Sequence, residues 1–296
     1  MTSDDEPSPD ALVRVAFHND RWVPAESMTM RLEDLALTQA VCAVERIRGY
    51  DGRLFRCDAH LDRWSNTLRV LRMEHCPRGA AMKAILDRLL VANRPWIERT
   101  GDFGALVIAS PGIGMGQPTL IADLYSIDQI LIRHRIGEGT PLVVTSVQQP
   151  PNESWPRAAK VRCRLHYYLA DSQARATQTD ALGVLLDQDG TITETSIANL
   201  LLVEGTTIFS PESDQILPGV SLGVLRELAA ANGMGWSEQR LTPERLAAAD
   251  EVLLTGTSCG VWFANSIDGA SKKRGPIYAT LRSAFERFVR QQNTVR

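Results

Sequence analysis

Residues 184–203 read VLLDQDGTITETSIANLLLV, and this stretch carries the strongest structural signal in the chain. Apolar runs at Leu182–Leu186 and Leu200–Val203 flank the sequence DQDG (187–190), whose Asp and Gly residues favour a tight turn. The stretch therefore predicts a β-hairpin. It also places a carboxylate, Glu194, at the end of a strand, where a side chain can face a site.

Strand and helix patterns lie on both sides of this hairpin and follow no strict βαβ order. Apolar or alternating runs predict strands at 13–18, 41–48, 105–109, 119–124, 141–147, around 208 and at 251–255. Apolar residues at three- and four-residue steps predict helices from 58 onward and at 80–92, 166–176, 221–231, 243–249 and 277–290. This mixture favours an α+β fold.

The chain is predicted to form two domains. Residues 1–11 are polar and acidic, which predicts a disordered lead-in. The sequence RHRIGEGT (133–140) is charged, contains glycine and lacks apolar periodicity. We therefore expect a linker at 135–140, which separates a small N-terminal domain (12–134) from a larger C-terminal domain (141–296).

Composition excludes several classes of protein. The 296 residues include 32 basic and 35 acidic side chains, and this balance is too even for binding to nucleic acid or an anionic membrane surface. Hydrophobic residues make up 44 %, but no apolar run approaches the roughly 20 residues of a membrane span. The five cysteines are scattered, without metal-ligand spacing. The sequence predicts a soluble cytoplasmic protein with no metal, nucleic-acid or membrane partner.

Lysine is scarce in this chain. Lys83, Lys160, Lys272 and Lys273 are the only lysines, and the other basic residues are arginines. An arginine-favouring genome explains most of this bias, and position alone favours a surface charge for Lys160. Arginine cannot replace lysine where an unprotonated amine must attack an aldehyde, however, because its guanidinium is always charged. Lys160 is therefore the candidate for such chemistry.

Two later segments have the features of anion sites. Gly219 directly precedes a helix whose first turn carries Ser221, and free N–H groups at a helix start favour an anion. The sequence TGTS (255–258) ends a strand and supplies further N–H and hydroxyl donors. Each signal alone is weak, since glycine before a helix is common. Together with Lys160 and Glu194 they match what pyridoxal phosphate requires: an amine, a carboxylate for the pyridine nitrogen and a phosphate cradle.

Five segments, in this order, resemble the class IV (fold type IV) pyridoxal-phosphate family. That family contains branched-chain amino-acid transaminases, D-amino-acid transaminases and aminodeoxychorismate lyases. The resemblance extends from about Val13 to Asp268, and it implies a small α/β domain, a larger domain with a barrel-like β core, and a homodimer. The segments are GYDGRLFRCDAHLDRW (49–64), AAK (158–160), VLLDQDGTITETSIANLLLV (184–203), ILPGVSLGVL (216–225) and ADEVLLTGT (249–257).

The resemblance implies roles for individual residues. Lys160 becomes the Schiff-base lysine, Glu194 the partner of the pyridine nitrogen, and Arg63 the phosphate-binding arginine. Without the resemblance, an ion pair of Arg63 with Asp58 or Asp62 on a solvated face is the better interpretation. The other implied cofactor contacts are Thr195, Ser196, Val220, Ser221, Gly256, Thr257 and Ser258.

The substrate side departs from the family pattern. Gln39 and Ala40 stand where transaminases of the family have tyrosine or phenylalanine and glycine, and Leu165 replaces the tyrosine that branched-chain enzymes place five residues after the lysine. Glu45 is retained, but the threonine pair of the lyases is absent. Candidates for binding the substrate carboxylate are Arg46, Arg48, Arg162 and Arg164, with Gln39 as a further substrate contact. A solvated strand face or a contact across a dimer is the alternative for each arginine.

The resemblance implies an amino-acid transaminase that moves an amino group between an amino acid and a 2-oxo acid, with a branched-chain amino acid favoured. A D-amino-acid transaminase and an aminodeoxychorismate lyase that forms 4-aminobenzoate and pyruvate are the alternatives on the same cofactor. A third hypothesis, a scaffold that has lost catalysis, is disfavoured because a scaffold needs neither Lys160 nor Glu194.

Overall fold

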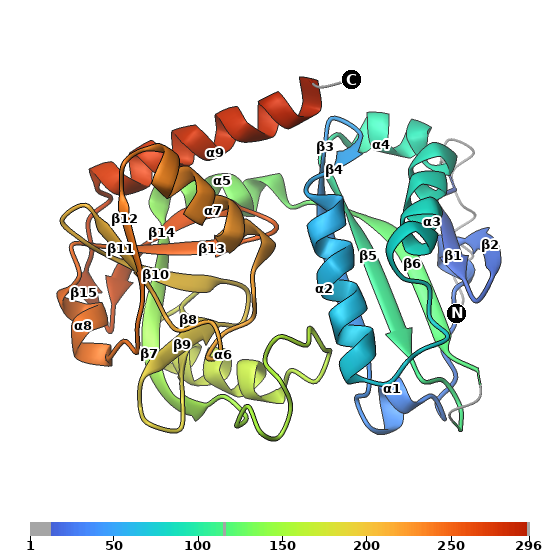
Figure 1. The fold of residues 1–296 in the computed structure, drawn as a ribbon, viewed down its shortest axis with the longest axis horizontal. Coiled ribbons are helices and arrows are strands. Elements are labelled where there is room, and N and C mark those ends of the chain that lie inside the picture. Colours follow the sequence, from blue (N-terminus) through green and yellow to red (C-terminus); the bar gives the residue numbers. More distant parts are fainter. Residues whose placement is uncertain (1–12, 115–116, 295–296) are drawn as a thin grey trace, which may run out of the picture.

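The computed structural model describes residues 13–114 and 117–294, and the chain folds into two lobes joined near residue 127 (Figure 1). The lead-in predicted for residues 1–11 lies outside the described residues. No helix in the described part of the chain is long and apolar enough to cross a bilayer.

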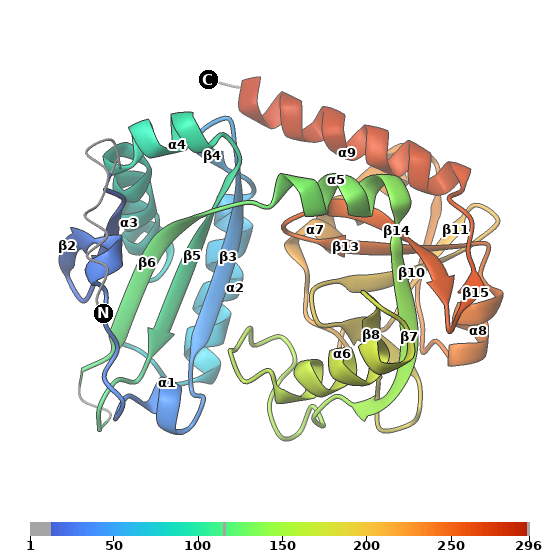
Figure 2. The ribbon, with the colours of Figure 1, turned by 180° about the vertical axis from the view of Figure 1, so that it is seen from behind.

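The first lobe is built on a six-stranded sheet in the order β2-β1-β6-β5-β3-β4. Helices α2 and α3 cover one face of this sheet, as the two opposite views show (Figures 1 and 2). The strands are β1 (Val15–His18), β2 (Arg21–Pro24), β3 (Ala43–Tyr50), β4 (Arg53–Leu54), β5 (Phe103–Ser110) and β6 (Thr119–Ser126). The helices are α1 (Leu35–Thr38), α2 (Cys57–Val70), α3 (Gly79–Ala92) and α4 (Arg94–Thr100).

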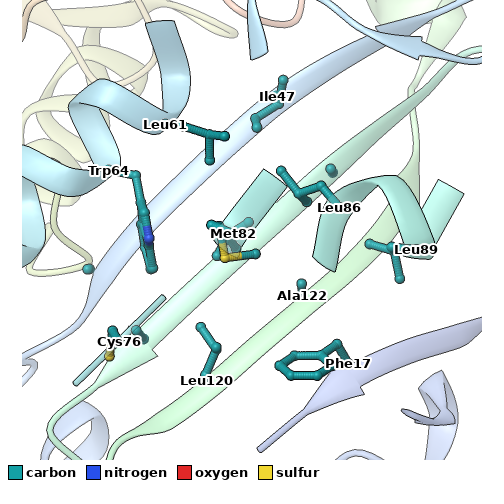
Figure 3. Close-up of a cluster of buried hydrophobic side chains, with 14 of the residues drawn as sticks. Phe17, Ile47, Leu61, Trp64, Cys76, Met82, Leu86, Leu89, Leu120 and Ala122 are labelled. Carbon is teal, nitrogen blue, oxygen red and sulfur yellow. The ribbon is translucent and has the colours of Figure 1, made fainter. Parts of the chain in front are cut away.

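The helical spacing predicted from residue 58 onward is confirmed by the core of this lobe. Leu61, Trp64 and Leu68 of α2 are buried against the sheet together with Met82 and Leu86 of α3. Figure 3 shows how these helices place their apolar side chains over the strands. The packing fixes α2, the helix that carries Arg63, directly beside β3.

The second lobe contains a closed β-barrel. Its strands pair in the order β10-β13-β14-β7-β8-β9, and the pairing of Asn199 with Glu194 joins β10 to β9 and closes the ring. The barrel-like core predicted for the larger domain is therefore confirmed. The barrel strands are β7 (Thr140–Gln148), β8 (Leu182–Leu186), β9 (Ile192–Thr195), β10 (Asn199–Glu204), β13 (Glu251–Gly256) and β14 (Gly260–Ile267).

Further elements surround this barrel. Strands β11 and β12 extend the sheet beyond β10, and β15 pairs with β14. Helix α6 packs on β7 and β8, while α7 and α9 pack on β13 and β14. Their bounds are β11 (Thr207–Ser210), β12 (Gly235–Glu238), β15 (Ala270–Ser271), α5 (Gln129–Glu138), α6 (Leu165–Thr177), α7 (Val220–Ala231), α8 (Pro243–Ala248) and α9 (Pro276–Thr294).

Strand β10 explains why the LLLV run (200–203) is apolar on both faces. Leu200 and Leu202 belong to the cluster inside the barrel. Leu201 and Val203 belong to a second cluster, which the outer helices α7 and α9 cover. Side chains alternate between the two faces of a strand, so a strand buried on both faces reads as a continuous apolar run.

The structure corrects the prediction of a hairpin between Leu182–Leu186 and Leu200–Val203. The DQDG turn is present, but it joins β8 to β9, and Leu200–Val203 lies in the next strand, β10. The hairpin partner of β8 is the strand that carries Glu194, and it was passed over for the apolar run after it because its residues ITET are mostly polar although all four are buried. Glu194 therefore lies within the barrel wall.

The structure also corrects the irregular linker predicted at 135–140. Residues 129–138 form helix α5, which begins where the Asp128 side chain accepts a hydrogen bond from the backbone N–H of Leu131 (2.9 Å). The helix has one buried side chain, Ile132, so its sequence shows no apolar periodicity. The Tyr278 hydroxyl donates to the carbonyl of Ile136 (2.9 Å) and ties the helix to α9.

Candidate active site

Lys160 lies in the loop that connects β7 to α6, and this loop is hydrogen-bonded to the first lobe. The backbone N–H of Lys160 donates to Oγ1 of Thr67 on α2 (3.0 Å), and its carbonyl accepts from the N–H of Val44 on β3 (3.0 Å). The N–H of Arg162 donates to the carbonyl of Cys42 (2.9 Å). The lysine is thus held at the boundary of the two lobes.

The environment of Lys160 favours a neutral amine. Burial lowers the pKa of Lys160 to about 8, and the positive charges of Arg63 and Arg164 act in the same direction, while Glu45 and Glu194 oppose it. A lysine with an ordinary pKa is almost fully protonated at neutral pH. A lowered pKa leaves a larger fraction of the amine able to act as a nucleophile or a base.

A second fixed group, the Glu194 carboxylate, lines the same cavity as Lys160. Its Oε1 accepts from the hydroxyl of Tyr167 (2.6 Å) and from Nε2 of Gln149 (3.3 Å). Its Oε2 accepts from Nδ2 of Asn199 (3.0 Å) and from the backbone N–H of Leu217 (3.1 Å). Four donors from four parts of the chain therefore fix this carboxylate.

Burial raises the pKa of Glu194, although the hydrogen bonds from Tyr167 and Leu217 and the charge of Lys160 oppose the shift. Burial and the adjacent Glu194 also raise the pKa of Tyr167, so this phenol stays protonated and donates. A buried carboxylate with a raised pKa is stabilised by a cationic N–H partner. The protonated nitrogen of a pyridine ring is such a partner.

Arg63 forms the wall of the cavity on the side of the first lobe. Its guanidinium pairs with Glu45 on β3, with a distance of 2.5 Å between Nη2 and Oε1, and its Nη1 donates to the carbonyl of Pro218 (2.9 Å). Burial would raise the pKa of Glu45, but Arg63 and His60 hold it at about 2. The alternative partners Asp58 and Asp62 are therefore excluded, and Arg63 bridges the two lobes.

The start of helix α7 lies beside Arg63 at the same end of the cavity. Gly219 precedes the helix and Val220 is its first residue. A Cβ at Gly219 would lie 2.2 Å from Oδ1 of Asn199, the residue whose amide binds Glu194. Similarly, a Cβ at Gly256 would lie 2.6 Å from the carbonyl oxygen of Ile197. A side chain at position 219 would collide with the Asn199 side chain and one at position 256 with the backbone of Ile197, and both glycines line the cavity.

The residues fit pyridoxal phosphate. The hydroxyl of Ser196 is buried and has no hydrogen-bond partner among the described residues, although it lines the cavity beside Lys160. Such a group is costly unless a ligand or a water satisfies it. The amine, the carboxylate as an acceptor, and the helix N-terminus and this hydroxyl as donors together provide the groups that the cofactor needs. No cluster of metal-ligating side chains occurs in the part of the chain that is described.

The structure brings most of the predicted site residues together. Nine of the ten predicted cofactor contacts line the cavity that contains Lys160, and the tenth, Ser258, lines an adjoining cavity with Lys160, Arg46 and Arg164. The nine are Arg63, Lys160, Glu194, Thr195, Ser196, Val220, Ser221, Gly256 and Thr257.

Two of the substrate-side candidates lie outside both cavities. Gln39 follows the short helix α1, is exposed and lines neither cavity. Arg48 is buried in an ion pair with Asp102, 2.8 Å between Nη2 and Oδ2, and donates to the carbonyl of Ser258 (2.9 Å). Val44 and Arg46 of β3 line the same cavity, as alternation along the strand predicts. Arg48 instead connects the two lobes through its hydrogen bond to Ser258.

Sequence reasoning missed the groups that fix Glu194. Tyr167 lies seven residues after Lys160, two positions beyond the tyrosine expected from the family pattern. Gln149 directly follows β7 and Asn199 begins β10, and neither position shows a local signal for a site. Their role depends on barrel closure, which places the start of β10 against the end of β9.

The chain belongs to the class IV aminotransferases. It matches the family described as "Amino-transferase class IV" over residues 43–267. This match includes both lobes, Arg63, Lys160, Glu194 and the start of α7.

Individual relatives are distant. "Branched-chain-amino-acid aminotransferase-like protein 2" of Arabidopsis thaliana is 25 % identical over 96 % of this chain, but the chain spans about half (52 %) of that relative's length. "D-alanine aminotransferase" of Listeria innocua is 26 % identical over 92 % of this chain and 95 % of its own. Among solved structures, a T.th. branched-chain amino acid aminotransferase, complexed with N-(5'-phosphopyridoxyl)-L-glutamate, has a TM-score of 0.80 at 24 % identity and covers 95 % of both chains. The fold is therefore that of the fold type IV aminotransferases.

Proposed function

We propose that this aminotransferase is a pyridoxal-phosphate-dependent amino-acid transaminase in which Lys160 forms the Schiff base. The observation that carries the proposal is one cavity lined by the half-buried Lys160, the carboxylate of Glu194 with its four hydrogen-bond donors, and the N-terminus of α7. The phosphopyridoxyl ligand of the solved T.th. aminotransferase is consistent with this assignment.

When bound, pyridoxal phosphate supplies an aldehyde that condenses with amines and a ring that accepts electrons from the substrate α-carbon. Lys160 contributes the amine that holds the cofactor between turnovers. When it is not bound to the cofactor, the amine of Lys160 would take the proton from the substrate α-carbon as a base and then return a proton as an acid. Its lowered pKa, about 8, suits both roles near neutral pH.

The other residues orient the cofactor. Glu194 keeps a proton on the pyridine nitrogen, and its hydrogen bonds to Tyr167 and Asn199 prevent it from rotating away. Val220 and Ser221 at the start of α7, together with Thr257, offer N–H and hydroxyl donors to the phosphate. Arg63 adds positive charge at the same end, although its primary partner is Glu45.

The substrates are an amino acid and a 2-oxo acid. Sequence resemblance favours a branched-chain amino acid. One relative is named for branched-chain amino acids and another for D-alanine. Branched-chain amino acids are therefore the first neutral donors to test. A D-amino-acid transaminase is the alternative, and an aminodeoxychorismate lyase is less favoured because Glu45-Arg46 replaces the threonine pair of the lyases.

We also propose a cytoplasmic homodimer. All five cysteines are free thiols, which suits a reducing compartment. Large apolar side chains are exposed on α6 and near α1, and such side chains are typical of surfaces that pair with another chain. They are Leu32, Leu37, Leu165, Tyr168 and Leu169. Light scattering on the purified protein tests the dimer, and a monomer with full activity at nanomolar concentration would contradict it.

The experiment that tests the function compares Lys160→Ala with the matched surface variant Lys83→Ala after incubation with pyridoxal phosphate. Wild type and Lys83→Ala are expected to develop the visible absorption band of a lysine-bound cofactor and to lose it on adding an amino acid. Lys160→Ala is expected to show neither. If Lys160→Ala keeps the band and full turnover, the assignment is wrong. Conversion of the bound cofactor to pyridoxamine phosphate in the absence of 2-oxo acid separates a transaminase from a lyase.

A further inference from the structure

Helix α2 presents two buried stripes of side chains, one apolar and one polar. The apolar stripe packs on the sheet of the first lobe. One residue earlier at each step, His60, Arg63 and Thr67 form the polar stripe, and they are 1 %, 8 % and 0 % exposed. Residues three and four apart share a face of a helix, so the three polar side chains lie on one side of α2. Buried polar groups need hydrogen-bond partners, and the partners indicate what this stripe does.

The first two residues of the polar stripe contact the end of the cofactor cavity where α7 begins. The Arg63 guanidinium pairs with Glu45 and donates to the carbonyl of Pro218, two residues before α7. His60 supports this pair, since its Nδ1 lies 3.5 Å from Oε1 of Glu45. These contacts fix the position of α2 relative to the start of α7, where the donors for the cofactor phosphate are proposed to lie.

The third residue of the stripe, Thr67, contacts Lys160. Its Oγ1 accepts a hydrogen bond from the backbone N–H of Lys160 (3.0 Å). The same hydroxyl donates its proton to the carbonyl of Arg63, one turn earlier in α2 (3.0 Å). A hydroxyl has a single proton, so its donation to Arg63 leaves the lone pairs of Oγ1 to accept from Lys160. Thr67 lines neither cavity, so its effect on the site passes through the two residues that it holds.

Backbone groups of the first lobe also hold the loop that carries Lys160. The carbonyl of Lys160 accepts from the N–H of Val44, and the N–H of Arg162 donates to the carbonyl of Cys42. A substitution that changes only a side chain leaves these backbone groups in place. The contact from Thr67 is different, because replacing the side chain removes the acceptor of the Lys160 N–H. Thr67 therefore offers a way to change the position of the lysine without changing any residue that lines the cofactor cavity.

We propose that Thr67 is a positioning residue, which holds the backbone of Lys160 at a fixed distance from the start of α7. One helix makes both contacts, since Arg63 reaches the residue before the N-cap of α7 and Thr67 reaches the lysine. A cofactor bound at both ends requires the correct spacing between them, so a shift of the lysine costs reactivity although both ends are intact. The inference rests on the proposed function, because it assigns to α2 a role in attaching the cofactor to Lys160.

The first test measures hydrogen exchange of the Lys160 backbone amide by NMR, in the protein without cofactor. In the wild type this amide is expected to exchange at least about tenfold more slowly than in an unstructured peptide, because it is hydrogen-bonded. Thr67→Val keeps the shape of the side chain without the hydroxyl, and it is expected to abolish most of this protection. An unprotected Lys160 amide in the wild type would overturn the proposal, and this measurement needs no variant that folds.

The second test compares the attachment of pyridoxal phosphate with that of pyridoxal, which has the same aldehyde but no phosphate. The visible absorption band of the lysine-bound compound gives a dissociation constant for each. Thr67→Val is expected to weaken attachment of pyridoxal phosphate about tenfold and that of pyridoxal less than about threefold, because only the phosphate compound must reach both ends. Thr67→Ser keeps the hydroxyl and is expected to bind both compounds within about twofold of the wild type.

Thr145→Val is the matched control. Thr145 is also buried and donates to a backbone carbonyl, that of Val184 (3.0 Å), but it lies on β7 and lines neither cavity. This variant is expected to keep the wild-type ratio of the two dissociation constants. If Thr67→Val weakens both compounds equally or neither of them, the positioning role is wrong and the proposed function stands. If the wild type attaches no cofactor to Lys160, the proposed function fails and this inference fails with it.

Discussion

The two cavities that meet at Lys160 differ in how far their polar groups are satisfied. In the first, Glu194 receives hydrogen bonds from four donors, so the chain itself fixes that carboxylate. The second, adjoining cavity is lined by arginines, Arg46 and Arg164 among them, and by no carboxylate of the described residues. Groups that the protein satisfies are set for one geometry, whereas groups left without acidic partners are available to ligands that vary. The comparison associates the first cavity with cofactor chemistry and the second with the substrate.

The largest expected effect is at Glu194. Glu194→Gln keeps the shape of the side chain but removes the charge that holds a proton on the pyridine nitrogen, so we expect turnover to fall by about 100-fold or more. The midpoint of thermal unfolding should change far less. Glu204→Gln, a partly exposed partner of Arg245, is the matched control. A near-normal kcat in Glu194→Gln would contradict the assignment of the first cavity to cofactor chemistry.

The next effect concerns Arg157, which anchors the loop between β7 and α6 that carries Lys160. Arg157, in the same loop as Lys160, pairs with Asp187 (2.7 Å between Nη2 and Oδ1) and donates to the carbonyl of Gln215 (2.8 Å). Removing one partner of a buried ion pair leaves an uncompensated charge, so Arg157→Met is expected to reduce the free energy of unfolding by about 3 kcal/mol. Chemical denaturation measures this. The double variant with Asp187→Asn should recover part of the loss, and strictly additive losses would contradict the pairing.

A pH dependence follows from Lys160. Its pKa in the folded protein is about 8, below the ordinary lysine value of 10.5, so the unfolded state binds the proton more tightly. Stability without cofactor should therefore rise as pH increases from about 8 to about 10.5, since protons are released on folding in that window. The rate of cofactor attachment should rise with a midpoint near pH 8. Urea unfolding and stopped-flow absorbance measure the two, and Lys160→Met should remove the stability change.

The smallest effect is expected at Tyr167. Tyr167→Phe removes one of the four donors to Glu194 and keeps the ring that stacks on Arg164. Turnover should fall only about three- to tenfold, because one net hydrogen bond contributes about 1 kcal/mol. The affinity for 4-methylvalerate, an unreactive branched acid, should be unchanged. A loss of this affinity equal to the loss of turnover would show that the two cavities do not act separately.

The sequence contained enough information for the fold class and for most of the cofactor cavity. Lys160, Glu194 and the start of α7 lie in segments with local signals, namely a rare lysine, a strand-end carboxylate and a glycine before a helix. The helices over the first sheet could also be predicted, because Leu61, Trp64 and Leu68 follow helical spacing on one buried face. Each of these features depends on residues close together in the chain.

Other features depend on contacts between distant residues. Barrel closure by Asn199 and Glu194, the burial of the polar strand β9, and the pairing of Arg48 with Asp102 have no local pattern. Helix α5 was hidden because a helix with one buried side chain shows no apolar stripe. Arg135 was not predicted as a site residue for the same reason, because only the packing of α5 brings it to the second cavity.

The central claim is that Lys160 carries the cofactor, and the scarcity of lysine allows a direct test. The protein is mixed with pyridoxal phosphate, reduced with borohydride and digested, and the modified peptide is identified by mass spectrometry. The account predicts that the phosphopyridoxyl group is found on the peptide containing Lys160, at one equivalent per chain. Modification of Lys83, Lys272 or Lys273 instead, or of no lysine, would contradict it.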